Sequence, residues 1–536
     1  MNPPGPADLV ILNAHVWTAD PALPETQAVS ARGGRIDYVG TEDGTGLWIG
    51  PRTRVIDAKG RLVLPGFHDD HTHFITGGEK SGGLDLRDAA TPDELGRRVA
   101  AFARTLPPGA WVTGGDWDND KWPGGELPTA ALLDRHCPDR PVFIGRFDEH
   151  MGAANSLALR LAGVTAATED PVGGTIVRRP GSREPAGVLK DAAGNAVRRV
   201  IPPPDPARLA DAARRAFREA ARFGVTTIHD MLDGEPHLRA YEAARVSGDM
   251  TARVYGRWPI AQWEWLADRV RSKGFGDDLF TLRSLKGFYD GSIGSSTALF
   301  FAPYADGTPG TGLPGDEADR IPGWAVAADR AGLQISLHAI GDRAIAEGLD
   351  LLERLVRENG PRDRRFRIEH DQHPRPEDLP RHAALGAFAS AQPAHLADDG
   401  RYVEARLGPA RDRTAYPFRA FLDAGIRLGF GSDWTVATLD PIAGIDAAVN
   451  RRTTGGLHPD GWNPGQKLTV AEAIRAYTTS NAWAAYAEDR TGSITVGKDA
   501  DLVVLDRDLL RIPPDEIAGT RVDFTILAGR VVHEKT

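Results

Sequence analysis

Short apolar runs that end in a polar residue recur along most of this chain of 536 residues. Such runs are typical of strands that are buried on both faces, as in a parallel sheet. One run ends at His71, and seven more lie further along, at 224–230, 252–258, 285–290, 334–338, 366–370, 387–392 and 426–433. Segments with helical periodicity separate them; the first, 207–223, places Leu209, Ala213 and Phe217 on one face. The pattern predicts an α/β protein with a (β/α)8 TIM-type barrel.

Both ends of the chain have a different pattern, because strand-like runs there follow one another without helices. They lie at 8–18 and 54–64 near the start, and at 501–506 and 524–528 near the end. We expect residues 1–62 and 489–536 to form one small β-sandwich domain. The barrel would then begin with a strand at 63–73 and continue through 225–488.

Residues 74–224 separate the first two barrel strands and are far longer than a strand-to-strand crossover requires. We interpret them as an inserted subdomain that lies like a lid over the mouth of the barrel. Trp117 and Trp122 lie among its glycine-rich turns and are expected to form an apolar wall against a substrate. A structural insertion remote from the site is the alternative.

The charge balance narrows the classes of partner. Lys and Arg number 64 against 74 Asp and Glu, a net charge of −10, which argues against nucleic acid or an anionic membrane surface. The chain lacks an apolar run near the ~18 residues of a membrane span. Its first residues do not resemble a signal peptide, so we expect a cytoplasmic protein. The single cysteine, Cys137, excludes an internal disulfide and is expected to be inert.

Histidines and an aspartate lie where a barrel presents its reactive groups. His71 and His73 are one residue apart, so a strand would direct both imidazoles to the same side. Three later strands end in His338, His370 and Asp433. Each of these residues alone is more often an ordinary polar residue with hydrogen-bond partners than a metal ligand. Together, at the carboxyl ends of barrel strands, they predict a metal site.

Several motifs together resemble the amidohydrolase superfamily and, within it, the YtcJ-like or amidohydrolase-3 group. The resemblance covers essentially the whole chain and rests on the segments 65–73, 224–230, 286–292, 367–370, 390–395, 431–434 and 492–502. Members of this superfamily are metal-dependent (β/α)8 hydrolases. The resemblance therefore implies the same fold and a hydrolytic activity for this chain.

The resemblance also implies a binuclear metal centre held by His71, His73, a bridging lysine, His338, His370 and Asp433. Lys286 is expected to be the lysine, carboxylated by carbon dioxide, because a carbamate offers two oxygens whereas an ammonium has no lone pair. Lys190 is a rival for this role. Nitrogen and oxygen ligands without cysteine suit Zn²⁺, while Mn²⁺, Fe²⁺ and Co²⁺ stay open. Two ions would activate a bridging hydroxide, with Asp433 as the proton shuttle.

Further residues are expected to bind the substrate. His150 matches a family histidine that reaches the substrate from the insertion, and His229 and His395 are candidates for binding the carbonyl or, alternatively, for capping the barrel rim. The resemblance extends to enzymes similar to N-substituted formamide deformylase. It favours cleavage of an amide-type C–N bond in a small N-acyl, N-formyl or carbamate substrate. A cyclic amide, lactam or ester hydrolase and a non-catalytic metal-binding scaffold are the alternatives, and the oligomeric state, monomer or homodimer, stays open.

Overall fold

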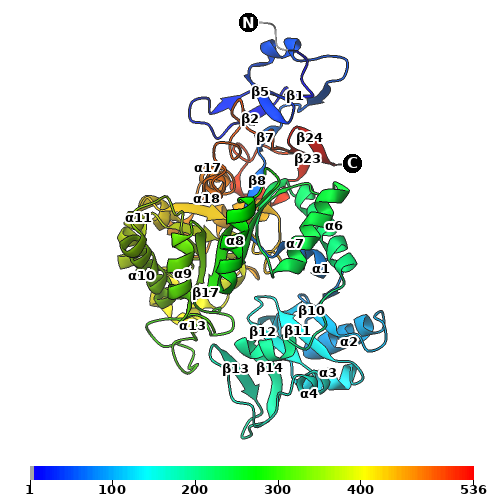
Figure 1. Cartoon of the computed structure of the whole chain (residues 1–536), viewed down its shortest axis with the longest axis vertical. Coiled ribbons are helices and arrows are strands. Elements are labelled where there is room, and N and C mark those ends of the chain that lie inside the picture. Colours follow the sequence, from blue (N-terminus) through cyan, green and yellow to red (C-terminus); the bar gives the residue numbers. More distant parts are fainter. Residues whose placement is uncertain (1–4, 536) are drawn as a thin grey trace.

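Eight parallel strands form the centre of the computed structural model, which describes residues 5–535 (Figure 1). They follow one another around the sheet in chain order: β8 (Phe67–Thr72), β15 (Val225–Met231), β16 (Arg253–Pro259), β17 (Phe280–Phe288), β18 (Gln334–Ala339), β19 (Arg367–His370), β20 (Phe388–Ala391) and β21 (Arg427–Phe430). A parallel bridge between Thr72 and Trp434 brings the first and last strands together. The predicted barrel is confirmed, and the ring of strands is nearly closed.

Helices cover the outside of this barrel. The main ones are α1 (Phe74–Lys80), α6 (Pro206–Arg222), α7 (Glu235–Ser247), α8 (Trp263–Lys273), α9 (Ile321–Arg330), α10 (Asp342–Asn359), α11 (Leu379–Leu385), α15 (Phe418–Asp423), α16 (Pro441–Asn450), α17 (Val470–Ala476) and α18 (Thr479–Ala484). Helix α6 shows why they form where they do. The Asp205 side chain caps its first turn by accepting from Ala207 N, and Pro206 supplies a fixed φ at the start. Its apolar face, including Leu209 and Phe217, is buried in the barrel core.

The two ends of the chain form one β-domain, as expected. One sheet contains β1 (Leu9–Leu12), β4 (Ala28–Arg32), β5 (Arg35–Gly40) and β6 (Arg54–Asp57). The other contains β2 (His15–Trp17), β3 (Glu25–Thr26), β7 (Leu62–Pro65), β22 (Leu502–Leu505), β23 (Val522–Leu527) and β24 (Arg530–Glu534). Ile11 and Val29 from the first sheet share a buried core with Leu502 and Ile526 from the second.

The predicted first barrel strand, 63–73, is split by the structure. Its first part, β7, pairs with β22 in the terminal domain, and only β8 belongs to the barrel. Gly66 lies at the change of sheet, where a Cβ would come within 2.2 Å of Thr226 Oγ1. Only a glycine fits this close approach, which marks the boundary between the two domains.

The insertion forms a separate domain with a six-stranded sheet, in the order β13 (Gly174–Arg178), β14 (Pro185–Asp191), β12 (Met151–Ala154), β11 (Val142–Arg146), β10 (Val112–Trp117) and β9 (Leu84–Asp85). Helices α2 (Pro92–Ala103), α3 (Ala130–His136) and α4 (Ser156–Leu161) pack with it (Figure 1). The predicted limits 74–224 are too wide. Phe74 of α1 and Phe217 of α6 lie in the barrel core with their rings 5.1 Å apart, so both flanking helices belong to the barrel.

Two expectations from composition can be placed on this fold. Cys137 is buried at the end of α3, and burial raises the pKa of its thiol. Within residues 5–535, no helix combines the length and the apolar character that crossing a bilayer demands.

Candidate metal centre

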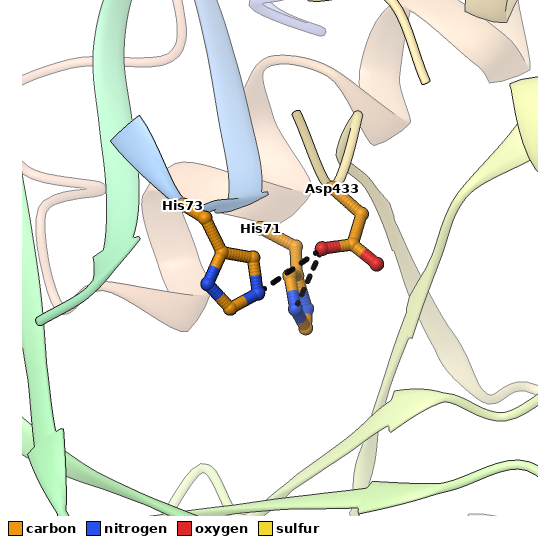
Figure 2. Close-up of side chains that lie close together, drawn as sticks. All are labelled: His71, His73 and Asp433. Carbon is orange, nitrogen blue, oxygen red and sulfur yellow. Dashed lines mark ion pairs between the residues drawn. The ribbon is translucent and has the colours of Figure 1, made fainter. Parts of the chain in front are cut away.

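Three of the predicted ligands meet where the first and last barrel strands end. His71 lies on β8, His73 follows it, and Asp433 lies in the loop after β21. Asp433 Oδ1 is 3.5 Å from His71 Nε2 and 3.4 Å from His73 Nε2. Figure 2 shows both imidazoles, from the end of the same strand, beside this carboxylate, which comes from a separate loop. The arrangement offers two nitrogens and an oxygen to one ion.

The other oxygen of the same carboxylate faces a second group. Asp433 Oδ2 is 3.9 Å from His370 Nδ1 and 3.9 Å from His395 Nε2. His338 lies beside this group, with its ring centroid 4.4 Å from that of His370. His338 Nε2 lies 3.0 Å from the Gly291 carbonyl oxygen. His395, expected to bind substrate, has a candidate ligand atom within 4.8 Å of those of His370 and Asp433. The carboxylate therefore lies between two sets of nitrogen donors.

Lys286 lies within the same cluster. Its Nζ is 3.3 Å from His71 Nε2, and burial lowers the pKa of its ammonium to about 8. A lysine with a lowered pKa more readily supplies the neutral amine that carbon dioxide can carboxylate. Lys190, the rival, lies on β14 of the inserted domain and donates to the Ser295 carbonyl at 2.8 Å. Of the two lysines, Lys286 is the one that lies among the candidate ligands.

The donor set fits divalent cations. Burial lowers the pKa of His71 to about 3 and that of His370 well below its ordinary value, so both imidazoles are neutral and keep a lone pair. Asp433 Oδ1 is buried without a hydrogen-bond partner among residues 5–535. Buried polar atoms without partners are rare in folded proteins, and a bound cation would explain this one.

A buried charge network holds His71 from behind. Glu369 Oε2 accepts from His71 Nδ1 at 2.6 Å and lies 3.0 Å from Arg257 Nη1, while its Oε1 accepts from Arg367 Nε at 2.8 Å. Against the effect of burial, these guanidinium groups hold the pKa of Glu369 well below its usual range. A carboxylate on Nδ1 fixes the tautomer and leaves Nε2 for a metal. His370 Nδ1 is likewise 2.8 Å from Gln392 Oε1, so this imidazole too keeps Nε2 for a metal.

The sequence reasoning assigned Glu369 no role, although it lies in the quoted segment 367–370. The signal was present, since Arg367 and Glu369 are two residues apart on one strand and must face the same side. Both side chains are fully buried and point into the barrel interior.

His229 has a different position from the one expected. It is fully buried on β15, and its Nδ1 accepts from Arg367 Nη1 at 3.0 Å. It is absent from the lining of the cavity beside the metal centre. The prediction that His229 contacts the substrate is therefore wrong for this structure. Strand alternation directs its side chain into the barrel interior, where Arg367 donates a hydrogen bond to it.

A cavity of about 670 Å³ lies between the barrel end and the inserted domain. The barrel contributes candidate metal ligands, including Lys286, His338 and Asp433. The insertion contributes residues of β11 and β12 and, from the turn between these strands, His150. His150 Nδ1 is 2.6 Å from Asp191 Oδ1, and its ring centroid is 5.3 Å from that of His338. The insertion thus covers the barrel mouth, and His150 faces the cavity as expected.

Trp117 and Trp122 do not line this cavity. Both are buried in the core of the inserted domain, where Trp117 Nε1 donates to the Ile144 carbonyl and Trp122 Nε1 to the Ala89 carbonyl. Their predicted role as a substrate wall is corrected, because the glycine-rich turns fold their indoles onto the domain's own sheet. Phe288, by contrast, lines the cavity with 42% of its surface exposed.

Comparisons with known proteins agree with this geometry. A family model described as "Amidohydrolase family" matches residues 54–533. Protein LONG AFTER FAR-RED 3 of Arabidopsis thaliana is 38% identical over 93% of this chain and 87% of its own length. The putative amidohydrolase YtcJ of Bacillus subtilis is 31% identical over 91% and 92%, and the N-substituted formamide deformylase of Arthrobacter pascens is 29% identical over 99% of both chains.

A solved structure shares the fold. The crystal structure of an uncharacterized metal-dependent hydrolase from Pyrococcus horikoshii OT3 superposes with a TM-score of 0.75 at 27% identity, over 95% of this chain and 99% of that one. The resemblance found from the motifs, including the YtcJ-like group, is confirmed by these matches.

Proposed function

Because the chain belongs to the amidohydrolase family and is a hydrolase, we propose that it cleaves an amide-type C–N bond in a small N-acyl, N-formyl or carbamate substrate. One observation carries the proposal. The two oxygens of Asp433 face two separate sets of histidine nitrogens, at 3.4 to 3.9 Å, at the end of a substrate-sized cavity. That geometry suits two cations and a proton acceptor in one place.

The ligands divide between two sites in this proposal. His71, His73 and Asp433 would hold one ion, most suitably Zn²⁺, and His338 and His370 would hold the other, with a carboxylated Lys286 as the ligand common to both. When bound, such ions polarise a carbonyl oxygen and lower the pKa of a coordinated water toward about 7. Glu369 keeps His71 oriented with Nε2 toward the site.

Asp433 is the proposed proton shuttle. Its carboxylate is buried, and neighbouring imidazoles of His71 and His73 keep its pKa well below its ordinary value despite burial, so it is ionised and able to accept a proton. It takes the proton of the attacking water and passes it to the leaving nitrogen, which departs as a neutral amine. In this proposal His395 and His150, which line the same cavity, orient the carbonyl.

The choice of an amide bond is supported by the formamide deformylase of Arthrobacter pascens, which matches over 99% of both chains. The Phe288 ring, exposed in the cavity close to His338 at 5.3 Å between centroids, favours a substrate with an apolar or aromatic substituent. The same site would accept a lactam only if the ring fitted between Phe288 and the metal centre.

A substrate screen tests the proposal. Metal-reconstituted protein is assayed with N-formyl amines, N-acyl amines, carbamates, lactams and esters that carry the same benzyl group. Faster hydrolysis of the open-chain amides than of lactams and esters, abolished by a chelator and restored by Zn²⁺, supports it. Preference for the lactams or esters would select the alternative hydrolases, and binding without turnover of any member would indicate a scaffold.

A further inference from the structure

The cationic side chains of the cavity differ in whether a carboxylate neutralises them. Lys80 Nζ is 2.7 Å from Asp116 and 2.6 Å from Glu149, and Arg146 is paired with Asp148 and Asp120, each at 2.5 Å. Apart from Lys286 in the metal centre, Arg198 is the one cationic cavity residue that lies beyond 4.0 Å from every carboxylate among residues 5–535.

Arg198 lines the cavity with an exposed side chain. It ends the short helix α5 (Asn195–Arg198) of the insertion, and its Nη1 donates to Asn195 Oδ1 at 3.1 Å. A guanidinium has five N–H groups, and the described residues supply an acceptor for one. Its side chain is exposed, yet desolvation lowers its pKa, which is the behaviour of a cation that faces a recess rather than open solvent.

We propose that Arg198 binds a carboxylate carried by the substrate on the part remote from the bond that is cleaved. This inference rests on the proposed function, since that function places the scissile bond at the metal centre. A guanidinium and a carboxylate match in two parallel hydrogen bonds, and Asn195 holds the guanidinium in place for them. Phe143, whose ring centroid is 5.8 Å from the Arg198 Cζ, packs against the same group.

The surroundings select a carboxylate over a more highly charged group. Asp233 and Asp316 also line the cavity, both exposed, and would repel a phosphate dianion more strongly than a single negative charge. Phe288 and Leu313 supply apolar surface in the same cavity. The inferred substrate therefore combines an amide group, an apolar group beside that amide and a carboxylate at the end of the chain on the amide's other side.

Matched substrates test the inference. N-benzoyl derivatives of glycine, β-alanine and 4-aminobutyrate are compared with their neutral carboxamides and with N-benzoyl diamines of equal length. For the best length, wild-type kcat/KM should favour the carboxylate over the carboxamide by roughly 10- to 100-fold, the range of a hydrogen-bonded charge pair. Arg198→Gln should bring this ratio close to one and leave the carboxamide unchanged, and Arg198→Lys should keep part of the preference.

Two further variants separate this role from others. Arg199→Gln removes the same charge from an exposed neighbour outside the cavity lining, and should leave the ratio unchanged. Asp233→Asn tests whether Arg198 instead latches the insertion to the barrel. The inference would be overturned if Arg198→Gln and Asp233→Asn lowered kcat/KM by the same factor for carboxylates, carboxamides and amines alike. It would also be overturned if Arg198→Gln kept the preference for the carboxylate. A wild-type preference for the amines would overturn it as well.

Failure of the proposed function gives a distinct result. If none of the compounds is hydrolysed by the metal-loaded protein, calorimetric binding of the N-benzoyl carboxylates and carboxamides takes the place of turnover. Tighter binding of the carboxylates to wild type that is lost in Arg198→Gln supports the role of Arg198. Equal binding of carboxylates to both proteins contradicts it.

Discussion

The two walls of the cavity hold their charged groups in different ways. On the barrel side, behind the residues that line the cavity, the fully buried Glu369 contacts Arg257, Arg367 and His71. On the insertion side, His150 is partly exposed and Arg198 exposed. Buried charges whose partners are all fixed cannot reorient with the substrate, whereas exposed ones can. The comparison indicates that the barrel wall sets the chemistry and that the insertion wall sets which substrate is accepted.

The strongest way to break this comparison is to change the proton shuttle. Asp433→Asn keeps an oxygen for a metal but cannot accept a proton, so kcat should fall roughly 100-fold or more for every substrate alike. Steady-state kinetics on a bulky and a small substrate, with metal content measured in parallel, checks this. A variant whose rate stays within about 10-fold of wild type would show that another group accepts the proton.

The next largest effect is expected at Glu369. Glu369→Gln removes the charge that orients His71 and leaves Arg257 and Arg367 facing a neutral amide. Loss of such an outer partner weakens metal binding by about 10- to 100-fold, and competition with a chelator measures it. Gln392→Ala offers a milder comparison at His370. If Glu369→Gln bound metal as tightly as wild type, Glu369 would not be needed to orient His71 for the metal.

The smallest changes in turnover are expected from two aromatic variants, one in the cavity and one in the core of the insertion. Phe288→Ala removes exposed apolar surface from the cavity, so kcat/KM for a bulky substrate should fall about 10-fold relative to a small one. Trp122→Ala should leave this ratio unchanged, because Trp122 is 4% exposed within the insertion core, but should destabilise the protein by about 3 to 5 kcal/mol. Thermal unfolding and the ratio of kcat/KM values distinguish them, and a changed ratio in Trp122→Ala would restore its role as a wall.

The barrel could be predicted from sequence because its rules are local. Apolar runs that end in His71, His338, His370 or Asp433 follow directly from strand alternation and from the meeting of parallel strand ends. The same rules failed for His229, since alternation alone does not tell whether a side chain reaches the cavity or stays among partners such as Arg367 inside the barrel.

The insertion wall was less predictable. Trp117 and Trp122 were expected in the cavity, but their indoles pack on a sheet whose strands β9 to β14 are short and irregularly spaced in sequence. The segment before Arg198 is irregular: Asp191 has a positive φ of 44°, and a turn of 3₁₀ helix comes next. The position of such a side chain depends on tertiary contacts that local periodicity does not carry.

The number of metal ions in the active protein tests the central claim most directly. Elemental analysis of purified protein, with activity measured on the same sample, should find close to two divalent ions per chain, because Asp433 faces two sets of donors. Lys286→Ala should lose at least one ion, with partial recovery when a short carboxylate is added. Full activity with a single ion, or with none, would contradict the two-ion centre.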